Sequence, residues 1–281
     1  MKTILITGAN TGIGAAAAIA LASPGVHLVL ACRSEAKAKP VLDAVRAAGA
    51  EASFLALDLT SLDGAARAGE RFAREHDRLD VLIDNAGLAG AHGLTADGWE
   101  LTFGVNHLGH FAFTLPLLPL LEKSGGRVVV VASGNHYKVD DVPFARLRTK
   151  ARGTGLPEYG VSKLANVLFT AELRRRYPKI GAVSLNPGRI ASDIWRRIPW
   201  PFRPILMLAL RMKPVADGGA TLVHAATIPL DASTPLYFDK MKARDANPAA
   251  LREDLASELW DFSVRAVEDA RKKEMPLGAA A

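Results

Sequence analysis

The stretch TGANTGIG, residues 7–14, joins an apolar run, KTILIT (2–7), to an alanine-rich segment with helical periodicity (12–23). A glycine-rich turn between a strand and a helix lets the backbone approach a diphosphate, and the N-terminus of the helix supplies positive potential. Such a turn alone is a weak signal and also occurs for purely structural reasons. The strand before it and the helix after it favour a dinucleotide site, for which the candidate residues are Gly8, Asn10, Thr11, Gly12, Ile13 and Gly14.

Short apolar runs alternate with helical segments along the rest of the chain. Runs rich in Val, Ile and Leu predict buried strands at 2–7, 26–32, 52–58, 79–84, 127–133, 182–187 and 235–238. Helical patterns separate them at 12–23, 35–48, 61–76, 98–122, 159–176, 215–228 and 248–272. This alternation predicts an α/β fold: one doubly wound, Rossmann-type parallel sheet of about seven strands with helices on both faces.

Two long segments interrupt the alternation, at 134–157 and at 189–213. Loops of this length inside a compact domain are usually functional. We expect 189–213 to form a substrate-binding loop or lid. The chain shows no repeat and no linker, so we expect residues 1–281 to form one domain that ends in the helix at 248–272.

The composition limits the class of protein. The chain is 49% hydrophobic and 23% charged, which is ordinary for a globular core, and its single cysteine, Cys32, permits no disulfide within the chain. A reducing cytoplasm fits this, as does the absence of a signal-peptide pattern before the first strand. The net charge is +6, but the basic residues form no stripe interleaved with aromatics, so we expect no nucleic-acid partner. No apolar run is long enough to predict an integral membrane segment.

The end of the second strand bears on cofactor choice. An acidic residue there would bind the adenosine ribose hydroxyls, whereas an arginine accommodates a 2′-phosphate. Cys32 takes the acid position, and Arg33 and Ser34 follow it. A guanidinium beside a hydroxyl suits a phosphate, so we expect NADP(H), with NAD(H) less favoured. The alternative is that Arg33 is only a surface charge.

Further elements resemble the short-chain dehydrogenase/reductase family. LDLTS (57–61) ends the third strand, DNAG (84–87) ends the fourth, and NPGRIAS (186–192) follows the sixth. The first asparagine of the family's NNAG element is replaced here by Asp84, and its usual threonine after the PG turn by Ser192. The resemblance implies cofactor contacts from Asp58, Leu59, Asn85, Ala86, Gly87, Pro187, Gly188, Ile190 and Ser192. A helix cap is the alternative role for Asp58.

The motif YGVSK (159–163) places Tyr159 and Lys163 four residues apart. That spacing alone only puts both on one helix face. In an open parallel sheet, however, the helix that follows Ser133 starts at the edge where ligands bind. The resemblance implies a catalytic set of Ser133, Tyr159, Lys163 and Asn106, with Tyr159 and Lys163 also touching the cofactor. We expect Lys163 to lower the pKa of Tyr159, Ser133 to stabilise the substrate oxygen and Asn106 to interrupt its helix and hold a relay water.

Several stretches resemble one branch of that family, the retinol dehydrogenase, WW-domain oxidoreductase and protochlorophyllide reductase-like branch. They are ACRS (31–34), VNHLGHF (105–111), the helix at 158–173 and the C-terminal 236–263, and Tyr159 lies 26 residues after Ser133. The chain departs from the branch at Ala132 and at Asn186, and we expect no N-terminal membrane anchor of the kind that many members of the branch carry. The resemblance implies hydride transfer between a hydrophobic alcohol and its aldehyde or ketone. It also implies a homodimer or homotetramer built on the helices at 98–122 and 159–176.

Other interpretations stay open. A regulatory protein that senses NADP(H) without chemistry would keep the fold, although retention of the serine, tyrosine and lysine argues against it. A membrane-associated scaffold is a third possibility, and 205–212 is apolar enough to touch a membrane but too short to span one. The histidines at 92, 107, 110 and 136 show no ligand spacing such as HExxH, so we expect no metal site.

Overall fold

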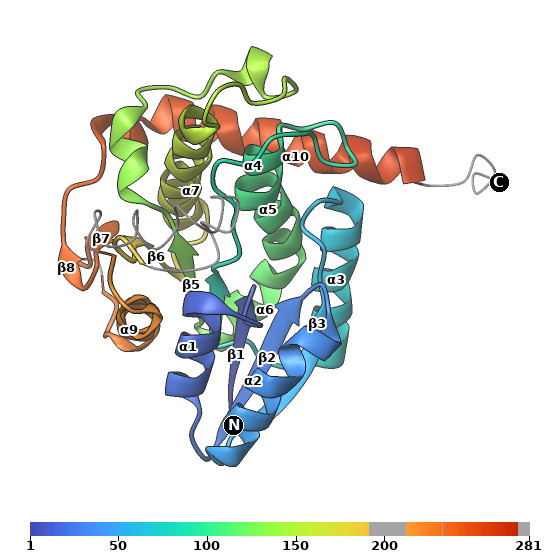
Figure 1. The fold of residues 1–281 in the computed structure, drawn as a ribbon, viewed down its shortest axis with the longest axis vertical. Helices are drawn as coiled ribbons and strands as arrows, with labels where there is room; N and C mark the ends of the chain where they lie inside the picture. The colour runs from blue at the N-terminus through green and yellow to red at the C-terminus, as the bar shows by residue number, and fades with distance from the viewer. Residues whose placement is uncertain (191–211, 232, 275–281) are drawn as a thin grey trace, which may run out of the picture.

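The computed structural model describes residues 1–190, 212–231 and 233–274. Figure 1 shows a central sheet with helices on both sides. The strands are β1 (Lys2–Thr7), β2 (Val26–Cys32), β3 (Glu51–Ala56), β4 (Val81–Asp84), β5 (Arg127–Val131), β6 (Gly181–Asn186), β7 (Tyr237–Asp239) and β8 (Lys242–Ala243).

The strand order in this sheet is β3-β2-β1-β4-β5-β6-β7-β8. All pairs are parallel except β7 with β8, which is antiparallel. Strands β2 and β3 are added on one side of β1, and β4 to β8 on its other side, so the strand order reverses between β1 and β4. In open α/β sheets ligands bind at such a switch point, beyond the carboxyl ends of the strands. The predicted doubly wound α/β fold is confirmed, with the two-residue β8 as an addition.

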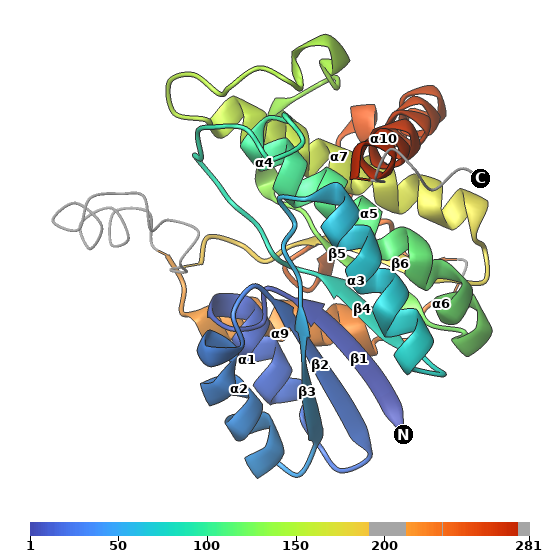
Figure 2. The same ribbon diagram turned by 90° about the vertical axis from the view of Figure 1, so that its right-hand side faces the viewer.

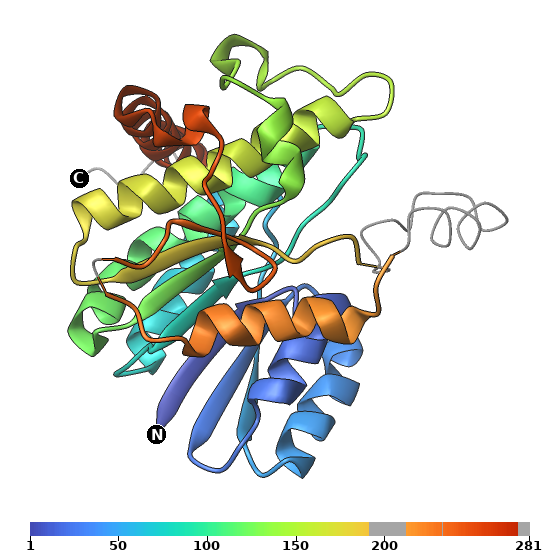
Figure 3. The ribbon, with the colours of Figure 1, turned by 90° about the vertical axis from the view of Figure 1, so that its left-hand side faces the viewer.

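The two faces of the sheet carry different helices. On one face α1 (Gly12–Leu21), α2 (Glu35–Ala47) and α9 (Val215–Thr227) cover the strands, and Figure 3 shows α9 beside α1. Their alanines, such as Ala17 and Ala18, let these helices approach the sheet closely. The other face is covered by α3 (Leu62–Glu75), α5 (Gly109–Thr114), α6 (Leu118–Ser124) and α7 (Leu156–Arg176).

A further helix, α10 (Glu253–Glu274), lies outside α7, as Figure 2 shows. Its buried residues recur every three or four positions, as expected for a helix with one apolar face: Leu255, Ala256, Leu259, Trp260, Ser263, Ala266, Val267 and Ala270. The Trp260 ring centre lies 5.0 Å from that of Phe111 and 5.8 Å from that of Phe169. The chain's own C-terminal helix therefore covers an apolar face of α7, one of the helices on which the resemblance predicts an oligomer.

The predicted helix at 98–122 is not continuous. It divides into α4 (Leu101–Phe103), a π-helical turn (Gly104–Leu108), α5, a 3₁₀ turn (Leu115–Leu117) and α6. The prolines Pro116 and Pro119 stand near the starts of the last two segments, because proline cannot continue the hydrogen-bonding of the preceding turn. The expected interruption at Asn106 lies within the π-helical turn.

The observed bounds of two further predicted helices also differ from those expected from the sequence. Helix α7 begins at Leu156, three residues before the predicted start, with Pro157 in its first turn, a position that suits proline. The C-terminal helix begins at Glu253, and a 3₁₀ turn, Pro248–Leu251, precedes it. The long segment 134–157 contains two 3₁₀ turns, at Gly134–Lys138 and Phe144–Arg146.

Candidate active site

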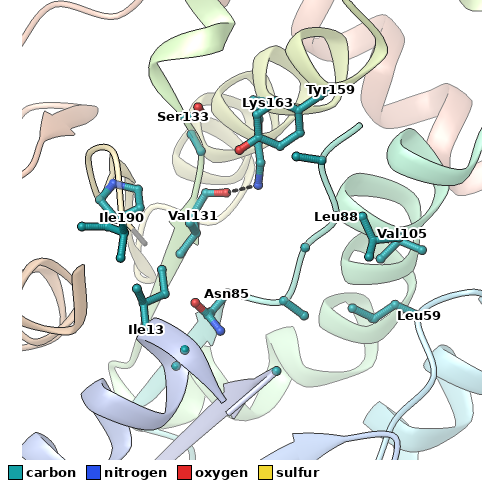
Figure 4. Close-up of a pocket in the computed structure, with 18 of the residues that line it drawn as sticks. Ile13, Leu59, Asn85, Leu88, Val105, Val131, Ser133, Tyr159, Lys163 and Ile190 are labelled. Carbon is teal, nitrogen blue, oxygen red and sulfur yellow. Dashed lines mark hydrogen bonds between the residues drawn. The ribbon is translucent and has the colours of Figure 1, made fainter. Parts of the chain in front are cut away.

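A cavity of about 1100 Å³ lies across the carboxyl ends of the strands. It joins the glycine turn after β1 to the start of α7, and Figure 4 shows side chains from both ends. Of the residues predicted from the sequence, those that line it are Gly8, Asn10, Thr11, Gly12, Ile13, Gly14, Arg33, Asp58, Leu59, Asn85, Ala86, Gly87, Ser133, Tyr159, Lys163, Pro187, Gly188 and Ile190.

The glycine turn has no room for side chains at two positions. A Cβ on Gly8, whose φ is +67°, would lie 2.9 Å from Ala86, and one on Gly14 would lie 2.4 Å from Nδ2 of Asn85. The turn is fastened to β4 through Thr7, whose hydroxyl oxygen accepts from the backbone N–H groups of Asn85 and Ala86, each at 2.9 Å. Backbone therefore forms the floor of the cavity here, as close approach of a diphosphate requires.

Asn85 adds a polar atom to this part of the cavity. Its Nδ2 donates to the carbonyl of Thr7 at 2.7 Å. Its Oδ1 is buried and accepts no hydrogen bond from the described residues, and Figure 4 shows it on the pocket side. A buried acceptor in this state fits a ligand that carries a hydroxyl donor.

The end of β2 presents Arg33 to the cavity, and its side chain is exposed. Ser34 does not line the cavity; its hydroxyl caps α2 by accepting from the backbone N–H of Lys37 at 3.4 Å. Asp58 lines the cavity, and its Oδ1 also accepts from the N–H and the hydroxyl of Thr60 at 2.9 and 2.8 Å. Ser61, not Asp58, is the cap of α3.

Tyr159 and Lys163 lie on the first turns of α7 and face the end of β5. The Nζ of Lys163 donates to the carbonyl of Val131 at 2.8 Å, as the dashed line in Figure 4 marks. Both side chains are almost completely buried, with 7% and 2% of their surface exposed. Figure 4 shows the Tyr159 hydroxyl turned towards Ser133. The predicted meeting of Ser133, Tyr159 and Lys163 thus exists in the fold.

The pKa shifts differ from the expectation for this pair. Burial raises the pKa of Tyr159, and the interaction with the Ser133 hydroxyl only partly offsets this. Burial also lowers the pKa of Lys163 to about 7. The expectation that Lys163 depresses the pKa of Tyr159 is therefore wrong for this structure. Removing both groups from water disfavours their charged forms, and an ammonium that is itself half titrated at neutrality attracts a phenolate weakly.

Asn106 does not line the cavity. Its Oδ1 accepts from the backbone N–H of Leu88 at 2.8 Å, and its Nδ2 donates to the carbonyl of Leu88 at 2.9 Å and to Ser162 at 3.0 Å. The side chain therefore holds the loop after β4 against α7. This loop carries Gly87 and Leu88 into the cavity.

Two buried histidines follow Asn106. Burial is the main cause that lowers the pKa of both His107 and His110 to about 3, so both rings are neutral. His107 contacts the hydroxyl of Ser263 in α10 at 3.1 Å, and His110 bridges Thr7 and the carbonyl of Asn106 at 2.9 and 3.1 Å. Both lie in the packed interior rather than in the cavity. No group of three or more His, Cys, Asp or Glu residues within the described part of the chain has the proximity to hold a metal ion.

Asp84, the departure from the family's first asparagine, is fully buried. Its Oδ2 accepts from the hydroxyl of Thr114 at 3.1 Å. Its Oδ1 accepts no hydrogen bond from the described residues. Burial raises the pKa of Asp84 to about 8, so the carboxyl is largely protonated at neutral pH.

The segment after β6 reaches the cavity at both of its ends. The backbone N–H of Lys213 donates to the carbonyl of Arg189 at 2.8 Å, and Ile190 and Lys213 form a parallel bridge. Ile190 and Met212 both line the cavity. Ser192 and most of the predicted lid at 189–213, including 205–211 of the apolar stretch, lie outside the described residues.

Several apolar and polar residues that line the cavity belong to none of the sequence motifs and were not predicted. The apolar ones near Tyr159 and Lys163 are Leu88, Leu101, Val105 and Leu156, and the polar ones are Asn135, Lys138 and Thr154. Leu88 follows DNAG directly, and Leu156 falls in the turn before YGVSK, so adjacency to the motifs was the available signal.

Comparison with known proteins bears on the family and the fold. A family model for short chain dehydrogenases matches residues 2–200. The chain is 36% identical to retinol dehydrogenase 14 of Mus musculus, over 93% of this chain and 84% of that protein. It is 35% identical to the WW domain-containing oxidoreductase of Homo sapiens, over 95% of this chain and 68% of that protein.

Among solved structures, an uncharacterized protein from Mycobacterium paratuberculosis superposes with a TM-score of 0.75 at 30% identity, covering 95% of this chain and 94% of that one. The fold and the site thus define an oxidoreductase of the Rossmann type. The chain belongs to the short chain dehydrogenase family, and its similarity to the retinol dehydrogenases and the WW domain-containing oxidoreductase confirms the branch expected from the sequence.

Within residues 1–190, 212–231 and 233–274, no helix combines the length and the apolarity that crossing a bilayer requires.

Proposed function

We propose that the protein is an NADP(H)-dependent oxidoreductase that interconverts a hydrophobic alcohol and its aldehyde or ketone by hydride transfer, with Tyr159 as the general acid and base. One observation supports this above the others. Ser133, Tyr159 and Lys163 line the same cavity as the glycine turn and Arg33, so one bound molecule with a diphosphate at its middle would reach both ends.

The cofactor end supports NADP(H) through three features. The glycine turn offers backbone to a diphosphate, the buried Oδ1 of Asn85 offers an acceptor to a ribose hydroxyl, and Arg33 offers a guanidinium to a 2′-phosphate. Neutral Cys32 replaces the acidic residue that would repel that phosphate. When bound, the nicotinamide supplies or accepts the hydride.

At the other end, the protein's own groups handle the proton. Because burial raises the pKa of Tyr159, the phenol holds its proton at neutral pH and can donate it to a substrate oxygen during reduction. Ser133 is placed to donate a hydrogen bond to the same oxygen as charge develops on it. Lys163, with a pKa of about 7, exchanges protons readily near neutrality and is held in place by the carbonyl of Val131.

The substrate would be hydrophobic. Leu88 and Val105 lie on the same side of the pocket as Lys163 (Figure 4), and Leu101 and Leu156 add to the apolar lining. Apolar lining with a few placed polar groups is the usual composition of a small-molecule site. The relatives named above include a retinol dehydrogenase, which supports a lipophilic alcohol or aldehyde. We place the reaction in the cytoplasm, since Cys32 is the single cysteine of the sequence.

Turnover tests the proposal directly. Purified protein should oxidise NADPH in the presence of members of a panel of aliphatic and aromatic aldehydes and ketones, with longer apolar chains preferred. A catalytically silent sensor of NADP(H) would bind NADPH and show no turnover with any member of the panel.

A homodimer or homotetramer remains part of the proposal. Because α10 covers the apolar face of α7, such an assembly would have to include the outer side of α10 or a surface elsewhere. One chain has a mass of 29.9 kDa, so the mass of the particle in solution distinguishes a monomer from a dimer or a tetramer.

A further inference from the structure

The turn that carries Ser133 is bonded to a segment more than a hundred residues away. His136 has none of its surface exposed, and Asn247, just before α10, is 4% exposed. The Nδ1 of His136 lies 2.7 Å from the carbonyl oxygen of Ser133. The Nε2 of the same ring accepts from the backbone N–H of Asn247 at 3.1 Å. These contacts fix the neutral tautomer, with the proton on Nδ1, so the ring donates to Ser133 while it accepts from Asn247.

The Asn247 side chain strengthens this link. Its Nδ2 donates to the carbonyls of His136 and Val139, both at 2.7 Å. Its Oδ1 accepts from the backbone N–H of Ala249 at 2.9 Å, which caps the 3₁₀ turn that leads into α10. The amide thus makes three hydrogen bonds, two from Nδ2 to the serine turn and one to Oδ1 from its own segment.

The same C-terminal segment also reaches the turn after β6. The backbone N–H of Lys240 donates to the carbonyl of Asn186 at 2.7 Å, and Asn186 Nδ2 donates to Asp239 at 2.9 Å. Residues 237–250 therefore touch two of the loops that line the cavity. Rings pack behind the link, since the His136 ring centre lies 4.6 Å from that of Tyr237.

We propose that His136 and Asn247 are positioning residues for Ser133, holding its hydroxyl where the substrate oxygen binds by tying its turn to the C-terminal segment. This inference rests on the proposed function for the role of Ser133. Neither residue lines the cavity, so neither touches the reacting atoms. Both act through the backbone of residues 133–139, where the carbonyl of Ser133 accepts from the N–H of His136 as well as from its ring.

Matched variants separate the parts of the link. His136→Ala removes both bonds of the ring. His136→Asn keeps a donor near the position of Nδ1, and Asn247→Asp keeps the cap on Ala249 but loses both donors to the serine turn. His27→Asn is the control, since His27 contacts Ser53 at 2.8 Å on β2 and β3 and does not line the cavity.

We expect kcat for carbonyl reduction to fall about tenfold in His136→Ala and Asn247→Asp, with the Kd for NADPH unchanged. His136→Asn should recover most of the loss, and His27→Asn should leave kcat unchanged. A merely structural role would lower the melting temperature of His136→Ala and Asn247→Asp while the folded protein kept its kcat. Wild-type kcat in these two variants would overturn the inference.

Amide exchange makes the test independent of activity. In His136→Ala and Asn247→Asp, the N–H groups of Asn135 and His136 should exchange at least tenfold faster, while those of β1 keep their wild-type rates. Unchanged exchange at these two amides overturns the link even if the wild-type protein reduces no carbonyl compound. If exchange quickens but the wild type has no turnover, the proposed function fails and, with it, the role assigned to Ser133.

Discussion

The Nζ of Lys163 lies 5.6 Å from the centre of the Tyr159 ring and donates to the carbonyl of Val131. The lysine is thus held by the end of β5, two residues before Ser133, and not by the phenol. Burial is the main cause of the pKa shift of both groups: it raises the pKa of Tyr159 and lowers that of Lys163.

Tyr159→Phe tests the acid–base role. The change removes one hydroxyl and keeps the ring that packs at the start of α7. We expect kcat to fall by about 10²–10⁴-fold, the usual contribution of general acid–base catalysis, while NADPH affinity and the melting temperature stay near wild type. Steady-state kinetics on the best carbonyl substrate, with NADPH titration by fluorescence, measures both. Near wild-type turnover in this variant would falsify the mechanism.

Lys163→Met tests the burial of the ammonium through stability. The pKa of Lys163 is about 7 in the folded chain and near 10.5 when unfolded, so the unfolded chain binds more protons between these values. The free energy of unfolding should therefore rise with pH across this window and include the full cost of the buried charge below pH 7.

The methionine variant lacks this titration. We expect the free energy of unfolding of this variant, relative to that of the wild type, to be higher at pH 6 than at pH 9 by about 3 kcal/mol. Urea denaturation at the two pH values measures the difference. An equal effect at both would show that the Lys163 pKa is not lowered.

Asp84→Asn has the opposite dependence. Burial raises the folded pKa of Asp84 to about 8 from 3.8, so its contribution to stability is full below pH 4 and is lost as pH rises through 8. Relative to wild type, the free energy of unfolding of the asparagine variant should rise by about 4 kcal/mol between pH 5 and pH 9. Thermal unfolding across that range provides the measurement, and a constant offset would contradict the raised pKa.

Arg33→Ala tests cofactor choice. NADPH should bind more weakly by about 1.5–3 kcal/mol, the value of a charge-assisted hydrogen bond, because its 2′-phosphate loses the guanidinium. NADH binding should change little, since NADH carries no such phosphate. Calorimetric titration with each cofactor compares the two affinities in the variant and in the wild type. Equal affinity of the wild-type protein for NADH and NADPH would rule out the assignment.

Assembly is tested by light scattering at micromolar concentration. The homo-oligomer predicts a mass of at least two 29.9 kDa chains. A substitution on the outer side of α10, such as Arg265→Glu, should then shift the mass if that side forms the contact. A single monomer mass for the wild-type chain would remove the oligomer from the proposal.

Much of the fold could be predicted because local signals and topology agree. Buried parallel strands read as continuous Val, Ile and Leu runs, and the glycine turn identified the switch between strand and helix. The meeting of Ser133 with Tyr159 then followed from the rule that such strands end at one edge. No side-chain contact was needed for that inference.

The rest depended on tertiary contacts that no local pattern reports. Asn106 was recognised as a helix break, but its bonds to Leu88 arise only when the loop after β4 meets α7. The pKa of Tyr159 was predicted from its neighbour Lys163, whereas depth of burial decides it. The cover that α10 places on α7, and the link from His136 to Asn247, join residues far apart in sequence.

The cover formed by α10 also concerns how the protein is made. Every residue of the proposed site precedes α10 in the chain, so a chain that lacks α10 contains the whole site while Phe111 and Phe169 lack their contacts with Trp260. Chaperones bind aromatic side chains that are exposed in this way, and chains that stay incompletely folded are degraded by proteases. A premature stop codon just after Leu251 would spare the proposed catalytic and cofactor residues, yet we expect its phenotype to be a loss of cellular abundance.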